Sequence, residues 1–245
     1  MMYVIPFCSS SEEQVNTMEN VKGRLRAFPA LRQDFKIYSK EEYPYKVSFP
    51  KHVEKVILDS GAFALSTVKR KMDTAYILAL EQYYFYNADE RCICVAPDMF
   101  LNPIQSMYNF KKWHAQTGLK VAAVLQSDRK NSVNLKELMK QAEYYRKYTD
   151  VIFFSNPSLT GETAKGFHLQ KLFKFMKKEL EVKWIHNLGA GWSIDDIKSW
   201  REIGYFDSMD SISYYSTKDV AAFGSLDPIK NIKNIMKVMN SDASI

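Results

Sequence analysis

The chain has 245 residues, of which 46% are hydrophobic, so it can bury a sizeable core in one large domain or two small ones. Its net charge of +6, from 34 Lys and Arg against 28 Asp and Glu, favours a polyanionic partner without requiring one. No apolar run approaches the roughly 20 residues that cross a bilayer, and no repeat, low-complexity tract or linker divides the chain, so we expect one domain over residues 1–245 and no membrane partner.

Eight short runs rich in β-branched and apolar residues recur along the chain, as is typical of buried strands. They lie at residues 3–7, 34–39, 54–60, 92–98, 120–127, 150–155, 183–189 and 208–215. Helical patterns separate most of these runs, so we expect strands and helices to alternate.

The helical patterns repeat their apolar residues at three- and four-residue spacing and carry their own start signals. The first begins at a capping box, Ser9 or Ser10 with the acidic residues at 12 and 13, and continues through Leu25 and Phe28. Later helices are expected from Pro103 onward and at residues 135–145, 169–180, 194–203 and 229–239. Alternating elements imply parallel strands joined by crossovers, and eight such units predict an α/β fold, a single (β/α)8 TIM-type barrel. A doubly wound open sheet is the competing architecture.

Six of the expected strands place a polar residue or a glycine at or near their carboxyl ends, which in a barrel converge on one mouth. These residues are Asp59, Asp98, Gln126, Ser155 with Asn156, Gly189 and Asp210. Each alone fits a turn or a helix cap equally well. Their joint placement is what predicts a functional site at that mouth.

Five segments in this order carry a family resemblance. They are LDSGAF (58–63), APD (96–98), LQS (125–127), NLGAG (187–191) and MDSISY (209–214). As short islands over roughly residues 55–215, they resemble the tRNA-guanine transglycosylase superfamily, and most of all its compact phage-type 7-deazaguanine DNA transglycosylases. The resemblance implies a transferase that replaces guanine in DNA with a 7-deazaguanine derivative, such as 7-cyano-7-deazaguanine, through a covalent Asp–sugar intermediate.

By this resemblance Asp210 is the catalytic nucleophile that attacks the sugar C1′, a role that suits a carboxylate at an oxocarbenium-like centre. Asp207 is the rival, but the DS-x-SY spacing falls on Asp210. Asp59 is then the general acid and base, which protonates the departing guanine and later takes a proton from the incoming base.

The base itself needs a recognition pocket. One carboxylate can accept from N1 and N2 of guanine together, which suits Asp98, and the Gln126 amide or backbone N–H groups near Ser155 and Asn156 can donate to O6. Phe63 offers a ring for stacking, with core filling as the alternative, and His186 lines the pocket or is a structural residue. The full set of expected substrate-binding residues is Asp98, Gln126, Ser60, Gly61, Phe63, Ser155, Asn156, His186, Leu188 and Gly189.

Nucleic acid would be held by basic residues that follow the strand ends. These are Lys69, Arg70, Lys71, Arg129, Lys130 and Lys218. Since a paired guanine is stacked, the enzyme would flip it out or act on single strands. Tyr214, Tyr215 and Trp192 are candidates to stack on neighbouring bases, with packing as the alternative reading.

Some features of the tRNA enzymes are missing from the sequence. It has no C-x-C-x-x-C cluster with a downstream His, so we expect no zinc or other cofactor, and we interpret Cys92 and Cys94 as core residues. Only about thirty residues follow Tyr215, and Ala62 stands where many tRNA enzymes have Gly. We therefore expect DNA rather than tRNA as the partner, together with free 7-deazaguanine. Three cysteines and a start without a signal sequence predict a cytoplasmic protein, in the host cytoplasm if it is phage-encoded.

Three alternatives stay open. The same exchange on tRNA guanine is the first, and a catalytically silent barrel that binds nucleic acid or supports a partner subunit is the second. The third is an unrelated barrel lyase or isomerase acting on a phosphorylated metabolite, with LGAGW (188–192) as its phosphate loop.

Overall fold

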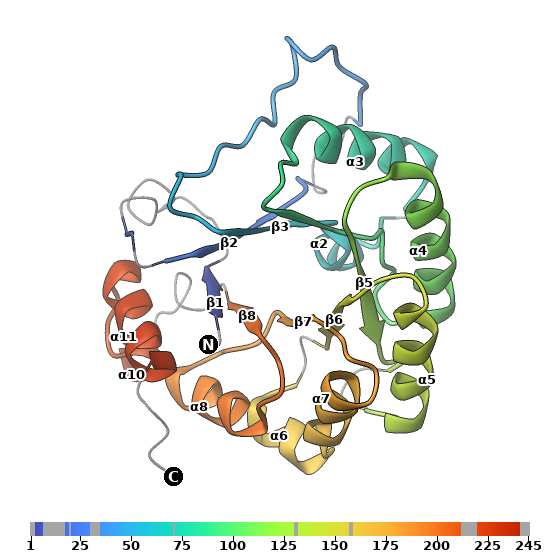
Figure 1. The fold of residues 1–245 in the computed structure, drawn as a ribbon. Coiled ribbons are helices and arrows are strands. Elements are labelled where there is room, and N and C mark those ends of the chain that lie inside the picture. The colour runs from blue at the N-terminus through green and yellow to red at the C-terminus, as the bar shows by residue number, and fades with distance from the viewer. Residues whose placement is uncertain are drawn as a thin grey trace.

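In the computed structural model the chain forms a ring of eight parallel strands with helices around its outside (Figure 1). The structure describes residues 3–6, 18–19, 21–29, 35–70, 72–129, 132–156, 159–211 and 220–240. The strands are β1 (Tyr3–Pro6), β2 (Gly23–Ala27), β3 (Lys55–Asp59), β4 (Cys92–Val95), β5 (Val121–Gln126), β6 (Val151–Ser155), β7 (Trp184–Leu188) and β8 (Ser208–Ser211). They pair in the order β1-β8-β7-β6-β5-β4-β3-β2, and the two end strands contact each other, which confirms the predicted (β/α)8 barrel over an open sheet.

The helices are α2 (Ala62–Thr67), α3 (Thr74–Asn87), α4 (Pro103–Thr117), α5 (Leu135–Arg146), α6 (Gly161–Gly166), α7 (Leu169–Lys178), α8 (Ile194–Ile203), α10 (Val220–Phe223) and α11 (Pro228–Asn240). Two of the expected helices, those that begin at residues 103 and 194, start at a side-chain cap. The Asn102 side chain accepts from the Gln105 N–H at 3.0 Å, and Ser193 accepts from the Asp196 N–H at 3.1 Å. These caps satisfy N–H groups that have no partner within the first helical turn.

Alternation along each strand decides which side chains enter the barrel. Ile57 of β3 belongs to the interior cluster, whereas its neighbours Val56 and Leu58 pack outward against the helical layer. Asp59 lies two residues after Ile57 and therefore shares its inward face. The interior cluster consists of Leu25, Ile57, Ile93, Val95, Ala122, Val124, Val151 and Phe153, with Trp184 and Leu188 partly buried against it. This apolar layer forms the floor beneath the polar residues at the strand ends.

The prediction of the second strand at residues 34–39 is wrong. Residues 35–39, inside the run expected as a strand, have no regular structure, and β2 lies instead at Gly23–Ala27. The sequence pattern predicts that segment as the end of the first helix, because Leu25 and Phe28 fit helical spacing from Val21 as well as they fit a strand. Leu25 is 1% exposed inside the barrel, so the interior selects the extended form. The capping box of that helix lies outside the described residues.

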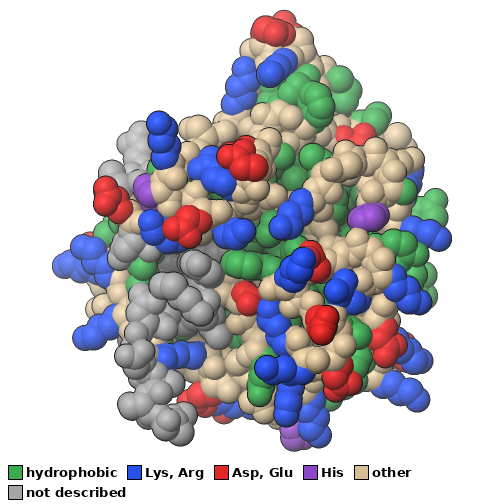
Figure 2. All heavy atoms as spheres, viewed as in Figure 1, with side chains coloured by type: hydrophobic (Ala, Val, Ile, Leu, Met, Phe, Trp, Pro, Cys, Tyr) green, Lys and Arg blue, Asp and Glu red, His purple; other side chains and the backbone are tan. Residues whose placement is uncertain are grey.

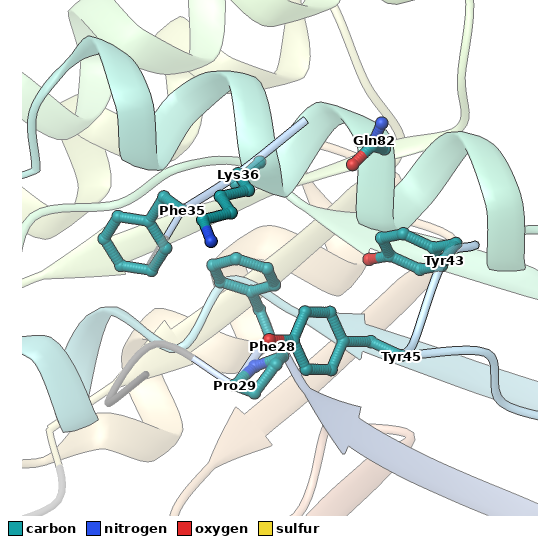
Figure 3. A pocket seen from close by; sticks show the side chains of 8 residues that line it. Phe28, Pro29, Phe35, Lys36, Tyr43, Tyr45 and Gln82 are labelled. Atoms are coloured by element: carbon teal, nitrogen blue, oxygen red, sulfur yellow. The ribbon is translucent and has the colours of Figure 1, made fainter. Parts of the chain in front are cut away.

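The apolar run at residues 35–39 has another use. Phe35 contacts Tyr76 of α3 at 5.5 Å between ring centroids, and Phe28 contacts the same ring at 5.5 Å. Figure 3 shows the small pocket that these aromatic side chains form, with Phe28, Phe35, Tyr43 and Tyr45 around it. The segment therefore covers α3 from the outside, and its hydrophobicity reflects packing in the helical layer.

The two described cysteines lie in the core. Cys92 and Cys94 are buried in the outer cluster and form no disulfide, which confirms their interpretation as core residues. Burial raises the pKa of the Cys92 thiol to about 12, so the group stays protonated near neutral pH.

In the described part of the chain, every helix is too short or too polar to cross a bilayer.

Candidate active site

Three carboxylates meet at the carboxyl end of the barrel: Asp59 at the end of β3, Asp98 in the segment after β4, and Asp210 on β8. Burial and, after it, the negative charges of Asp98 and Asp210 raise the pKa of Asp59 to about 7, while N–H groups of the following turn oppose the shift. Ser60, which follows Asp59, donates to Asp98 at 2.7 Å. Asp210 lies on β8, which pairs with β1, and β1 contacts β2, the neighbour of β3. The structure thus brings together the three acidic residues that the sequence placed at one mouth.

The turn after β3 fixes Asp59. Its Oδ2 accepts from the Gly61 N–H at 3.0 Å, and Gly61 has φ +76°, a backbone conformation that favours glycine. The Ser60 side chain is fully buried, and the Tyr76 hydroxyl of α3 donates to the Ser60 carbonyl oxygen. Helix α3 therefore holds the turn that carries Asp59.

Asp98 lies next to this turn, across from β5. Its Oδ1 accepts from Ser60 Oγ at 2.7 Å, and its Oδ2 accepts from the Gln126 amide. Burial raises the pKa of Asp98 to about 6, although the hydrogen bonds from Ser60 and Gln126 counteract this effect. Asp98 is consequently ionised at neutral pH, and each oxygen keeps a lone pair for another donor.

Gln126 is fixed from behind by Gln141 of α5. The Gln141 amide donates to the Gln126 carbonyl oxygen at 3.0 Å, and its oxygen accepts from the Gln126 N–H at 3.2 Å. The side chain of a helix thereby completes the hydrogen bonding of the end of a strand. The position of the Gln126 amide beside Asp98 follows from this clamp.

Asp210 is held from the side of β7. Its Oδ1 lies 3.0 Å from His186 Nε2 and accepts from the Gly189 N–H at 2.9 Å. His186 is fully buried, and its Nδ1 lies 2.7 Å from Ser208 Oγ. Both ring nitrogens are thus occupied by protein, so His186 supports Asp210 and offers no free nitrogen to a base.

Several buried polar atoms near the mouth have no protein partner among the described residues. The Asn156 side chain is 4% exposed and neither its oxygen nor its nitrogen is bonded, and Gln126 Oε1 and Ser127 Oγ are also unpartnered. A buried polar atom without a partner costs about 1–3 kcal/mol. Ser155 pairs in register with Gln126 on one side and Leu188 on the other, which brings these strand ends side by side. A polar ligand in the mouth would supply the missing partners.

Aromatic and basic side chains lie in the segments that follow the carboxyl ends of the strands. Phe63 is 53% exposed and contacts Phe100 at 5.4 Å between ring centroids, so the alternative that Phe63 fills the core is wrong. Trp192 is 52% exposed in the segment after β7. Arg70 lies over the Phe35 ring at 4.0 Å. These exposed rings are available for stacking.

The basic residues expected to hold phosphates are only partly described. Lys69 and Arg129 are exposed, and Arg129 lies 3.9 Å from Asp128. Lys71, Lys130, Lys218, Tyr214 and Tyr215 lie outside the described residues. On the face shown in Figure 2, Lys and Arg side chains are interleaved with Asp and Glu and do not gather in one patch. Among the described residues, no cluster of three His, Cys, Asp or Glu side chains is placed to hold a metal ion.

Asp207, the rival nucleophile, lies at the opposite end of the barrel. Its carboxylate pairs with Lys177 at 2.6 Å and accepts from the Ile185 N–H at 2.6 Å. Ile185 stands at the start of β7, whereas Gly189, which donates to Asp210, follows its end. The geometry therefore separates Asp207 from the carboxylate cluster.

Three supporting residues were not predicted: Tyr76, Gln141 and Ser208. A signal for Tyr76 existed, because Asp73 caps α3 and its buried residues recur at helical spacing. Leu78 and Phe85 of the same helix are 45% and 77% exposed, and these outward apolar residues hid the pattern. The contacts of Gln141 and Ser208 cross between elements, so the sequence carried no signal for them.

Comparisons with known proteins show the fold and leave the chemistry open. No family model matches the chain, and no curated protein matches it. Among solved structures, "QR15, an Aldolase" is 14% identical with a TM-score of 0.53, and the match covers 99% of this chain and 97% of that one. Fructose-bisphosphate aldolase from Campylobacter jejuni is 12% identical with a TM-score of 0.49, covering 97% of this chain and 88% of that one. The carboxyl transferase domain of Rhizobium etli pyruvate carboxylase is 11% identical with a TM-score of 0.40, covering 75% of this chain and 40% of that one. At such identity the likeness to QR15 shows the barrel fold alone.

Proposed function

We propose that this chain is a base-exchanging transglycosylase, which replaces guanine in DNA with a 7-deazaguanine derivative through a covalent bond between Asp210 and the sugar. The observation that carries the proposal is the set of three carboxylates at one mouth, each in a different environment. Asp59 has a pKa raised to about 7, Asp98 is bonded to Ser60 and Gln126, and Asp210 is bonded to His186 and Gly189. Paired acidic groups with separated roles are what glycosyl transfer requires.

In the first half of the reaction, Asp210 attacks C1′ of the target nucleotide as the C1′–N9 bond breaks. The departing guanine takes the electron pair of that bond and a proton from Asp59. A carboxyl with a pKa of about 7 suits this step, because near neutral pH it is protonated in about half of the molecules and can serve as acid and then as base.

In the second half, the incoming 7-deazaguanine loses its N9 proton to Asp59. Its N9 then attacks C1′, and the Asp210–sugar bond breaks with the electron pair returning to Asp210. The backbone of the nucleic acid is not cut at any stage, and Asp59 ends the cycle protonated again.

Asp98 is the base-recognition group. Its oxygens accept one hydrogen bond each from Ser60 and Gln126, and their remaining lone pairs suit the N1–H and N2–H donors of a guanine-like edge. Asn156 and Gln126 Oε1 are buried and unpartnered among the described residues, so they would bond to further polar atoms of the base. A purine without these donors would leave buried acceptors unpaired, which is a strong source of selectivity.

DNA is the proposed partner because the resemblance is to the DNA-modifying members of the superfamily, and the chain has a positive net charge and exposed Phe63 and Trp192 rings. The rings would stack on neighbouring bases when the target is flipped or single-stranded. The basic residues near the mouth, such as Lys69 and Arg129, would contact phosphates.

The test is label exchange. The protein is incubated with labelled guanine or 7-cyano-7-deazaguanine and either DNA or tRNA. We expect label in DNA, none with Asp210→Asn, and near-normal labelling with Asp207→Asn, since Asp207 lies at the other end of the barrel. Label in tRNA alone would replace the proposed substrate by tRNA, and label in neither would overturn the proposal in favour of a catalytically silent barrel.

A further inference from the structure

A buried hydrogen-bonded chain links β8 to β7 and back to β8. Ser208 Oγ lies 2.7 Å from His186 Nδ1, and His186 Nε2 lies 3.0 Å from Asp210 Oδ1. Ser208 and His186 are both fully buried, and the Phe153 ring packs against the imidazole at 4.8 Å between centroids. The imidazole is therefore locked in one orientation beneath the mouth.

The three residue types are those of a hydrolase triad, but the arrangement is different. In a hydrolase the serine bonds Nε2 and faces the substrate. Here Ser208 is fully buried and contacts Nδ1. Asp210, which is 5% exposed, is the member of the hydrogen-bonded series that lies at the mouth of the barrel. The order of contacts assigns attack to the carboxylate and support to the serine.

The hydrogen-bond partners also fix the roles of the two ring nitrogens. A carboxylate can only accept, so Nε2 donates its proton to Asp210, and Nδ1 then accepts from the Ser208 hydroxyl in the neutral imidazole. In this tautomer both ring nitrogens and the Ser208 hydroxyl have a hydrogen-bond partner.

The two oxygens of Asp210 are unequal as a result. Oδ1 accepts from both His186 Nε2 and the Gly189 N–H, whereas Oδ2 receives no hydrogen bond from the described residues. A lone oxygen without donors is the better nucleophile, since it need not give up a bond to attack. The oxygen that carries two donors is placed to stabilise charge.

We propose that His186 is a positioning residue that directs Asp210 Oδ2 to the sugar and stabilises the covalent intermediate through Oδ1. This inference rests on the proposed function. When Oδ2 bonds to C1′, Oδ1 becomes the carbonyl oxygen of the ester, and it retains its two donors. When the incoming base displaces Asp210, the electron pair returns to the carboxylate and Oδ1 again carries negative charge stabilised by the same donors.

The experiment compares His186→Leu, His186→Gln and Ser208→Ala with the wild-type protein in the label-exchange assay. Leucine fills the space without a donor, whereas the glutamine amide places an N–H near the position of Nε2. We expect His186→Leu to lower kcat about 100-fold, as loss of a donor to a developing charge does, with KM for the free base within about threefold. We expect His186→Gln to recover kcat to within about tenfold of wild type, and Ser208→Ala to lower kcat about three- to tenfold, as loss of one neutral hydrogen bond does.

Guanine affinity and the thermal midpoint of each variant separate positioning from loss of fold. If His186→Leu does not fold, His186→Gln and Ser208→Ala decide the matter by the split between kcat and KM. Unchanged kcat in Ser208→Ala, or equal losses in His186→Leu and His186→Gln, would overturn the inference. Absence of exchange by the wild-type protein would instead refute the proposed function.

A readout independent of activity completes the test. The ring nitrogens of His186 in the ¹⁵N-labelled protein should show a protonated Nε2 and an unprotonated Nδ1, and both signals should shift in Asp210→Asn. A protonated Nδ1 with a bare Nε2 would overturn the assigned orientation even in an active enzyme.

Discussion

Replacing Asp59 with asparagine should stabilise the protein above neutral pH while abolishing base exchange. The Asp59 carboxyl is surrounded by protein and faces the negative charges of Asp98 and Asp210, which together raise its pKa to about 7. Asparagine keeps an oxygen to accept from the Gly61 N–H but carries no charge. The variant therefore removes an ionisation that the fold opposes.

The size of the effect follows from the pKa. A rise from 3.8 to about 7 corresponds to about 4 kcal/mol between the folded and unfolded chains. Part of the residue reaches solvent at the mouth, so we expect about 2–4 kcal/mol. The folded chain holds its proton up to about pH 7, whereas the unfolded chain releases it near pH 4. Wild-type stability thus falls between these two values, and the deficit stays constant at higher pH.

The assay is urea unfolding followed by fluorescence at pH 4.5 and pH 8. Asp59→Asn should exceed wild type by about 2–4 kcal/mol at pH 8, equivalent to roughly 4–16 °C in Tm, and should differ little at pH 4.5. Asp195→Asn is the matched control, because its carboxylate is exposed on α8 and pairs with Lys198 at 2.8 Å. A variant that is no more stable at pH 8, or a gain that is the same at both pH values, would refute the reasoning.

Two further predictions address the same site, and a third addresses the packing of α6 against α8. Asp98→Asn should weaken guanine binding, measured by calorimetry, about 10- to 100-fold, since a hydrogen bond to a charged acceptor contributes about 1.5–3 kcal/mol. An unchanged affinity for guanine would exclude Asp98 as the base-recognition group. Release of guanine should slow about tenfold for each pH unit above about 7, as Asp59 loses its proton, and a flat profile would exclude Asp59 as the acid. Gly161→Ala should cost about 1–3 kcal/mol in urea unfolding, because the new Cβ would lie 2.6 Å from Ser199 Cβ; Gly166→Ala, with no atom within 4 Å, is the control, and equal losses would contradict the packing argument.

The polar residues at the strand ends could be predicted from the sequence, because the alternation that buries Ile57 places Asp59 on the same inward face two residues later. The sequence pattern failed at β2, since the spacing of Leu25 and Phe28 fits a helix and a strand equally, and only the barrel interior decides between them. It also could not assign His186, whose contacts with Ser208 and Asp210 cross from one strand to the next. Such contacts depend on the register between β7 and β8, which no local pattern specifies.

The most direct measurement is the capture of the covalent intermediate. The protein is mixed with guanine-containing DNA without free base, denatured, digested and analysed by mass spectrometry. We expect a nucleotide adduct on the peptide that contains Asp210, and no adduct in Asp210→Asn. An adduct on another residue, or exchange that proceeds while no adduct forms on the Asp210 peptide, would contradict the account.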